Sequence, residues 1–206
     1  MDAGIVLADR EGLDAFSMRK VAAALGYEVM SLYNHVANKD DLLDEMLDRV
    51  YAEVDDPPAA LAWRDSLRRV ATSARDELVR HPWAGELLTA RFPGPSRRRH
   101  MEGMLRVLAS AGLPDDVADR GFHALIVHIQ GFTQQQIGFT LLVETKAVEA
   151  ARFYEGLSAD ELPFFVAHLG YHAERGHRHD DFEFVLDLIL DGLERAVPPR
   201  RPRRPS

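Results

Sequence analysis

One short stretch near the N-terminus decides the fold. Residues 16–36 have the sequence Phe16-Ser17-Met18-Arg19-Lys20-Val21-Ala22-Ala23-Ala24-Leu25-Gly26-Tyr27-Glu28-Val29-Met30-Ser31-Leu32-Tyr33-Asn34-His35-Val36. Ser17 is suited to begin a helix, because its hydroxyl can accept a backbone N–H of the first turn. Gly26 follows the last apolar residue of that helix and favours the left-handed conformation that ends it. The stretch therefore predicts a short helix, a tight turn and a second short helix.

Two short helices joined in this way are what a helix-turn-helix requires. The expected core positions lie at helical spacing and are Val21, Leu25, Leu32 and Val36. The outward face of the second helix mixes hydrogen-bonding groups with a thioether and an aromatic ring, which suits base edges, thymine methyls and phosphates. An ordinary αα-hairpin with a solvated face has the same spacing, so spacing alone leaves both interpretations open.

The rest of the chain also shows helical periodicity, and the predicted fold class is all-α. Proline and glycine clusters separate helices expected near residues 1–10, 18–25, 28–34, 40–54, 63–80, 96–111, 115–140, 147–156, 160–174 and 181–197. The first three are too short to be stable alone and must pack together. We expect a helix-turn-helix DNA-binding domain at 1–47, a ligand-binding and dimerisation domain at 48–197, and a disordered Arg/Pro tail at 198–206.

The segment from Gly12 to Leu43 closely resembles the DNA-binding domain of the TetR family. The most specific part is Leu32-Tyr33-x-His35-Val36-x-x-Lys39, preceded by Leu25-Gly26. Members of this family are homodimeric, all-helical bacterial transcriptional regulators, and most are repressors released by a ligand. The resemblance thus implies three partners: a palindromic double-stranded DNA operator, a second copy of the chain, and a small-molecule effector of unknown identity.

The resemblance also assigns roles within the reading surface, which begins at the N-cap Ser17. Arg19 matches a position that reaches a base, where an arginine would bind guanine bidentately. Val29 and Met30 match base-reading positions and imply contacts with thymine methyls or with DNA shape. The positions that commonly hold phosphates are Ser31, Tyr33, His35 and Lys39, and Asn34 is a further base-edge candidate. His35 could instead be a structural histidine packed on Tyr33.

The charge distribution agrees with a small DNA-reading surface on an acidic body. The chain has 25 Lys+Arg and 33 Asp+Glu, a formal net charge of -8, which argues against a protein that coats nucleic acid non-specifically. Residues 1–50 contain five basic and ten acidic residues, whereas residues 17–39 contain three basic residues and Glu28 alone. The acids therefore lie mostly on helices that flank the expected reading surface.

Two long helices near the C-terminus are predicted to form the dimer interface. Gly121, Gly131 and Gly138 on the first of them suggest close helix–helix approach, since glycine destabilises a helix interior. In the family such helices from two subunits form a four-helix interface; a monomeric core is the alternative. The predicted interface residues are Phe122, Ile126, Ile129, Phe182, Val185, Leu186, Ile189 and Leu193.

A ligand pocket between helices is a weaker prediction, because Met and aromatic residues at helical spacing are often simply core. The candidate lining residues are Trp83, Leu87, Phe92, Met101, Met104, Leu105, Leu108, Phe122, His123, Gln135 and Phe139. Val70, Ala74 and Leu87 align with the positions that hold drug and magnesium in the tetracycline repressor. They offer no polar or metal-binding side chain, so a magnesium–tetracycline inducer is not expected.

Two further clusters have competing interpretations. His168 and His172 are spaced to bind one metal ion, with His177 and His179 nearby, but a solvated histidine-rich turn is the preferred interpretation of the pattern. We therefore predict no metal site; a helical metalloenzyme and a metal-sensing regulator remain the alternatives. Arg97, Arg98, Arg99 and His100 are expected to form a solvated surface patch.

The residue types and motifs that the sequence lacks exclude several classes of protein. The chain has no cysteine, which excludes disulfides, thiol nucleophiles and iron–sulfur clusters. No nucleophile motif, phosphate-binding loop or HExxH motif is present, so we expect neither an enzyme nor a cofactor. No secretory signal or apolar run of membrane-spanning length is found, and a cytoplasmic location without a membrane partner is expected.

Overall fold

A computed structural model describes residues 1–175 and 179–198, apart from the side chains of residues 142–144 and 172–180. Within these residues the chain forms eleven α-helices and no strand, which confirms the predicted all-α class. The helices are α1 (Asp2–Glu11), α2 (Met18–Leu25), α3 (Val29–Leu32), α4 (Lys39–Ala52), α5 (Trp63–Arg80), α6 (Pro82–Leu87), α7 (Pro95–Ser110), α8 (Asp115–Thr145), α9 (Ala147–Glu155), α10 (Pro163–Arg175) and α11 (His179–Ala196).

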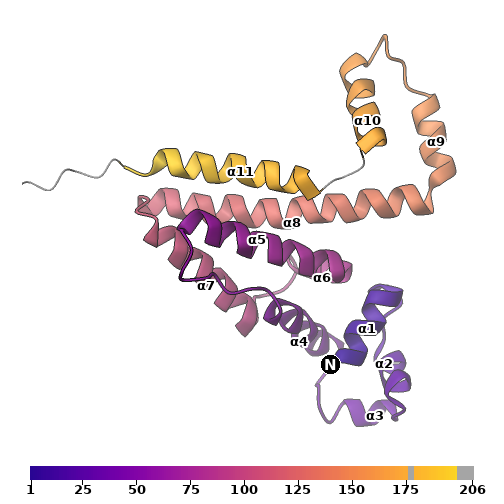
Figure 1. Cartoon of the computed structure of the whole chain (residues 1–206). Coiled ribbons are helices and arrows are strands. Elements are labelled where there is room, and N and C mark those ends of the chain that lie inside the picture. Colours follow the sequence, from indigo (N-terminus) through magenta and orange to yellow (C-terminus); the bar gives the residue numbers. More distant parts are fainter. Residues whose placement is uncertain (176–178, 199–206) are drawn as a thin grey trace, which may run out of the picture.

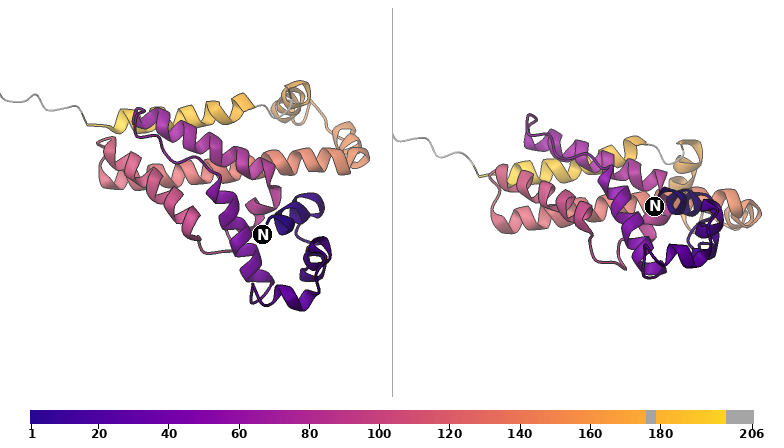
Figure 2. Two further views of the ribbon diagram at one scale, coloured as in Figure 1. Left: turned by 60° about the horizontal axis from the view of Figure 1, so that its bottom comes forward. Right: turned by 90° about the horizontal axis from the view of Figure 1, so that it is seen from below.

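The long helices form one body from which two smaller units extend. Helices α5, α8 and α11 run alongside one another, and α7 packs against α4, α5 and α8 (Figure 1). Helices α1–α3 form a small unit that the body contacts through α4 and α6, and the left view of Figure 2 shows it set apart from α5 and α11. Helices α9 and α10 follow the end of α8 that lies farthest from α7 (Figure 1).

A continuous hydrophobic core joins the small N-terminal unit to the body. It runs from Leu7 on α1 through Met46 on α4 and Trp83 on α6 to Leu186 on α11. Met46, Trp83 and Leu186 are almost completely buried, and burial of side chains of this size stabilises the fold by roughly 1.5–3 kcal/mol each. Because one core spans both units, the position of α1–α3 is coupled to the packing of the body.

Gly121 allows α11 to lie close to α8. A Cβ atom at this position would be 2.6 Å from Leu193 Cδ2 on α11, well inside van der Waals contact. The predicted close approach at Gly121 is therefore confirmed within the chain. Gly131 and Gly138 differ, because a Cβ at either position would meet nothing within 4 Å among the described residues.

Ion pairs hold α11 against α5. Arg64 on α5 pairs with Asp191 at 2.5 Å and with Asp187 at 3.0 Å. Arg68 on the same helix also pairs with Asp187, and its distance to Glu183 is 2.8 Å. The hydrogen bond from Arg68, opposed by partial desolvation, holds the pKa of Asp187 below its usual value. The acidic residues are spaced four apart on α11, so one side of this helix faces the arginines of α5.

The structure corrects three details of the predicted helices. The second helix of the N-terminal pair spans only Val29–Leu32, shorter than the expected 28–34. Helix α6 was not predicted, because six residues are too few for helical periodicity to be visible; Pro82 starts it at a position where its missing N–H is harmless. Leu25, an expected core residue, is 41% exposed at the end of α2. None of the helices of the described chain is long and apolar enough to cross a membrane.

Candidate nucleic-acid interface

The turn between α2 and α3 is built as the sequence predicts. Ser17 has an extended backbone, and its Oγ accepts a 3.3 Å hydrogen bond from the backbone N–H of Lys20. Gly26 ends α2 in the left-handed region at φ 73° and ψ 26°, a conformation that other residues rarely adopt. Three residues, Gly26 to Glu28, separate α2 from α3, and the two helices contact each other. These features place two short helices in the helix-turn-helix arrangement.

The outer face of this unit combines long apolar, aromatic and cationic side chains. Met30 is 70% exposed on α3, and Tyr33 lies exposed directly after it. Arg19 is exposed on α2, so the unit exposes a cation as well as a flexible thioether. Asn34 and His35 are exposed as well, whereas Ser17, Val29 and Ser31 are partly buried. Tyr27, which sequence reasoning missed, is 65% exposed in the turn beside them.

Two of the three basic residues of segment 17–39 already have partners in the free chain. Lys20 Nζ lies 2.8 Å from Glu11 Oε2, and this pairing lowers the pKa of Glu11. Lys39 donates a 2.9 Å hydrogen bond to the backbone oxygen of Phe16 and lies 5.5 Å from the centre of that ring. Because an ammonium group has three donors, Lys39 retains donors for a phosphate. The partner of Lys20 is an acid, so the positive charge of the surface is smaller than residue counts suggest.

Asp9 joins the N-terminal unit to α6 of the body. Its Oδ1 accepts a 2.7 Å hydrogen bond from Trp83 Nε1 and lies 2.8 Å from His81 Nδ1. Trp83 is 2% exposed, so its indole N–H would be buried without a partner if Asp9 were absent. Sequence reasoning missed this contact and placed Trp83 in a ligand pocket.

The segment before α7 contacts the acidic side of α4. Arg91 pairs with Asp40 at 2.6 Å and with Asp44 at 2.7 Å, and these hydrogen bonds outweigh partial desolvation and raise its pKa. Asp48 Oδ1 accepts backbone N–H bonds from Ser96 at 2.8 Å and Arg97 at 3.3 Å. Asp48 therefore caps the N-terminus of α7 from another helix, where a negative charge is favoured by the helix dipole.

The residues predicted to line a ligand pocket do not share one environment. Phe92 is 98% exposed, and Leu105, His123 and Gln135 also lie at the surface. These four side chains face solvent in the single chain. Met101 and Phe139 are partly buried. The others are buried in the core of the chain: Trp83, Leu87, Met104, Leu108 and Phe122.

His100 departs from the expected solvated patch. It is 4% exposed and packs edge-on against Tyr51 of α4, with ring centres 5.6 Å apart. Burial lowers the pKa of His100 to about 4, and Nδ1 has no hydrogen-bond partner. Burial also raises the pKa of Tyr51. Arg97 lies over the Tyr51 ring, so of the predicted patch only Arg98 and Arg99 are exposed.

Most of the predicted interface residues are buried within one chain. Phe122, Ile129, Phe182, Leu186 and Leu193 fill the contact between α8 and its neighbours, so they are not available to a partner. Ile126, Val185 and Ile189 are partly buried. The exposed apolar residues of the same two helices are Val127, Phe184 and Leu188. The apolar pattern thus could not separate the inner from the outer faces of these two helices.

Histidines of the predicted cluster lie largely outside the described side chains. His168 is exposed on α10, while the side chains of His172, His177 and His179 are outside the described residues. Among the side chains that the structure describes, no group of three or more His, Asp or Glu is placed to hold a metal ion.

Fold and surface together define a helix-turn-helix DNA-binding protein. Comparison with protein families gives the same result: residues 1–46 match the model of the bacterial regulatory proteins of the tetR family, and residues 57–197 match the tetracyclin repressor-like C-terminal domain. The chain belongs to the TetR family. It is a DNA-binding transcriptional regulator and not an enzyme, which confirms the class predicted from sequence.

Relatives and solved structures resemble the chain over most of its length. The HTH-type transcriptional repressor DrrR1 of Streptomyces coeruleorubidus is 33% identical, over 98% of this chain and 78% of that protein. The tetracycline repressor protein class D of Escherichia coli is 32% identical over 54% of this chain and 53% of its own length. The Streptomyces coelicolor TetR family protein ActR, solved in complex with actinorhodin, is 29% identical with a TM-score of 0.75, covering 96% of both chains.

Proposed function

We propose that the chain acts in the cytoplasm as a homodimeric repressor that binds a palindromic operator and is released by a small molecule. The observation that carries this proposal is the exposed surface of α2 and α3, where Arg19, Met30 and Tyr33 project from a helix-turn-helix. A surface of this composition lacks the dense positive charge of a non-specific binder. It is suited to read a particular sequence.

The proposed contacts divide by chemistry. Arg19 reads a guanine in the major groove, and Met30 contacts a thymine methyl, with Val29 packed behind it. Tyr33, His35 and Lys39 hold phosphates, Ser31 adds a hydroxyl donor, and Asn34 is available to a base edge. The partly buried Ser17 contributes by fixing the first turn of α2, the turn that contains Arg19.

We propose that two chains associate through the outer faces of α8 and α11. Val127, Phe184 and Leu188 are more than half exposed on these helices, and burying them against a partner removes apolar surface from water. Gly131 and Gly192 have open space where a Cβ would lie, so a second helix could approach closely there. A two-fold dimer places two recognition helices about 34–36 Å apart, the spacing of successive major grooves.

Release by a ligand is supported by the nature of the relatives. ActR has been solved with actinorhodin, and DrrR1 is named a repressor. In the present chain α1 is hydrogen-bonded to α6 and α4 is paired with the segment before α7, so a shift of the body would move the DNA-binding unit. A ligand that prefers the shifted arrangement would lower operator affinity by its difference in affinity for the two states.

Selection of binding sites from random double-stranded DNA tests the proposal with the full chain. We expect a palindrome whose half-sites are about one helical turn apart. Arg19→Ala should weaken binding to the selected site by about 1–3 kcal/mol, because a bidentate base contact is lost. Lys20→Ala is the matched control, since Lys20 is engaged with Glu11. Failure to enrich any sequence at low salt would overturn the proposal.

A metal-responsive regulator is the alternative that sequence reasoning left open. It requires operator affinity that depends on added zinc or nickel and that is lost in His168→Ala. Operator binding that is unchanged by metal and by a chelator removes this alternative.

A further inference from the structure

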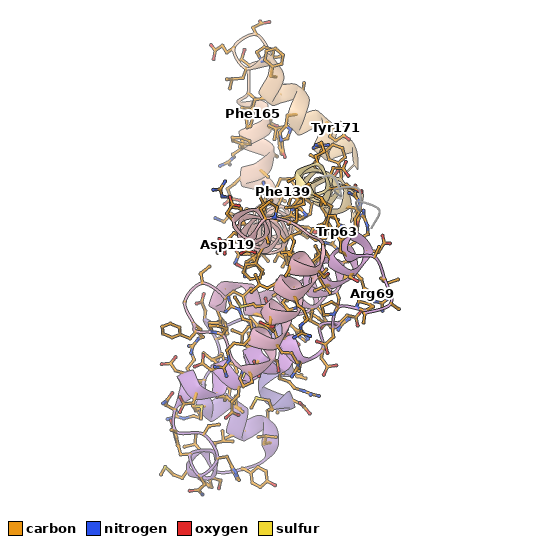
Figure 3. All side chains as sticks on the ribbon, turned by 90° about the vertical axis from the view of Figure 1, so that its left-hand side faces the viewer. Trp63, Arg69, Asp119, Phe139, Phe165 and Tyr171 are labelled. Carbon is orange, nitrogen blue, oxygen red and sulfur yellow. The ribbon has the colours of Figure 1, made fainter. Side chains whose placement is uncertain are left out.

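A cavity of about 520 Å³ lies between α7 and the segment that connects α4 to α5. This size is within the range of small-molecule sites in proteins, about 300–1,000 Å³. The cavity is formed by residues other than those predicted to line a ligand pocket. Figure 3 views the molecule from the side at which α5 begins and labels Trp63, the first residue of α5 and one wall of the cavity.

The connecting segment, residues 53–62, is held in place at three points. The backbone N–H of Asp55 donates a 2.9 Å hydrogen bond to Ser73, and Ser66 Oγ donates one of 2.9 Å to the Pro58 oxygen. Pro57 rests on α7 at Gly103, where a Cβ would be only 2.9 Å from the proline ring. These contacts fix residues 55–58 of the segment against α5 and α7, so one wall of the cavity is held in place.

The walls of the cavity are mainly apolar and partly flat. Trp63, Pro57, Pro58 and Leu61 come from the segment and α5, and Val107 faces them from α7. Leu61 is 46% exposed, so part of its apolar surface is open to a bound molecule. Flat apolar walls of this kind favour an aromatic or similarly planar molecule, which would cover them and release water.

The charges of the cavity are two arginines and one aspartate. Arg99 lies 3.9 Å from Asp56, and Arg106 lies 3.4 Å from Glu102, which is outside the lining. All four side chains are more than half exposed, and ion pairs of this length and exposure contribute little. The guanidinium groups therefore keep N–H donors that a carboxylate can accept in the planar, bidentate geometry that arginine favours.

We propose that this cavity binds a planar organic anion, with its carboxylate on Arg99 and Arg106 and its ring system against Trp63 and the prolines. The inference rests on the proposed function in one respect: the bound anion is the effector that controls operator release. The connecting segment leads directly from the C-terminal end of α4, so a molecule seated under it displaces that end of the helix. Asp40, Asp44 and Asp48 of the same helix contact residues 91–97.

Calorimetric titration of the full chain with 2-naphthoate and with the neutral 2-naphthamide tests the site directly. We expect the anion to bind about tenfold or more tightly than the amide, the effect of one charge-assisted hydrogen-bonded pair. The double variant Arg99→Gln/Arg106→Gln should lose this preference. Arg98→Gln, an equally exposed arginine of the same helix outside the lining, should retain it. Ser110→Trp, which fills the cavity from α7, should abolish binding of both compounds.

Equal binding of acid and amide, no binding of either, or a preference that survives the double variant would overturn the proposal. Circular dichroism melting of each variant separates loss of the site from loss of the fold. The same preparations are assayed for the selected operator. If the chain binds DNA but not naphthoate, the cavity proposal fails alone. If naphthoate binds through the arginines but no operator is found, the proposed function fails instead.

Discussion

Trp83 on α6 donates a hydrogen bond of 2.7 Å to Asp9 on α1, and this contact joins two residues that are 74 positions apart in the chain. The same carboxylate lies 2.8 Å from the His81 ring, so one oxygen of Asp9 contacts both Trp83 of α6 and the N-cap residue of that helix. The N-terminal unit is thus attached to the body by a polar contact at the edge of the shared core.

The Asp9–Trp83 contact should be measurable as a coupling energy. In a double-mutant cycle of Asp9→Ala and Trp83→Phe, we expect a coupling of about 1 kcal/mol or more in the free energy of unfolding, because the buried indole N–H loses its acceptor. Chemical denaturation of the four proteins gives this value. A parallel cycle with Trp63→Phe, the other tryptophan, should give a coupling near zero; a similar value in both cycles would contradict the contact.

Asp48 on α4 should stabilise the folded chain by capping the N-terminus of α7. Gly94, the N-cap residue of α7, has no side chain, and Asp48 supplies the missing acceptor. Asp48→Ala should cost about 1–2 kcal/mol of unfolding free energy, as for other lost N-caps. Glu45→Ala, an exposed change on the same helix, is the control and should stay within about 0.5 kcal/mol. Equal effects of the two changes would show that the cap is not formed.

The helix-turn-helix could be predicted because its information is local. Ser17 and Gly26 mark helix ends through hydrogen bonding and backbone conformation within a few residues. Such features need no knowledge of the rest of the chain. The all-α class was predicted for the same reason, since periodicity over a dozen residues is visible along the sequence.

Contacts between distant segments could not be predicted. Nothing near Asp9 indicates that Trp83 is its partner, and nothing near Asp48 indicates that it caps α7. The sequence also does not show which side of a helix faces solvent when apolar residues cover most of that helix. Phe182 and Phe184 are two positions apart on α11, yet one is fully buried and the other 64% exposed.

Stability should fall in mildly acidic solution because of His100. Its pKa is about 4 in the folded chain, below the usual 6.5, so the unfolded chain binds the proton more readily. The contribution is complete above about pH 6.5 and is lost as the pH falls toward about 4. Between pH 7 and pH 5 we expect a loss of about 2 kcal/mol from this residue.

Thermal melting as a function of pH checks this expectation with His100→Phe as the matched variant. Phenylalanine keeps a ring against Tyr51 and removes the buried nitrogen that has no partner. Its melting temperature should therefore depend less on pH over the same window. Some dependence should remain, because burial also lowers the pKa of His128. Identical pH profiles of the two proteins would exclude His100 as a source.

The proposed dimer face gives a further prediction. Phe184→Glu combined with Leu188→Glu should convert the dimer to monomer in analytical ultracentrifugation, because two charges would be buried between the chains. Both residues are more than half exposed in one chain, so its folding should be little affected. Phe164→Glu on α10, at an even more exposed phenylalanine, is the control and should remain dimeric. A dimer that persists in the double variant would place the interface elsewhere.

One side of helix α11 is ion-paired with α5, and another side is apolar and exposed. Glu183, Asp187 and Asp191 face the arginines of α5, while Phe184 and Leu188 point away from the chain. Since the acidic side fixes the rotation of the helix, the outward residues can change without disturbing how the chain folds. If the outward side is the proposed dimer face, mutation there alters which copies pair with one another while leaving each subunit intact, so related repressors with this architecture can diverge into lineages that no longer form mixed dimers.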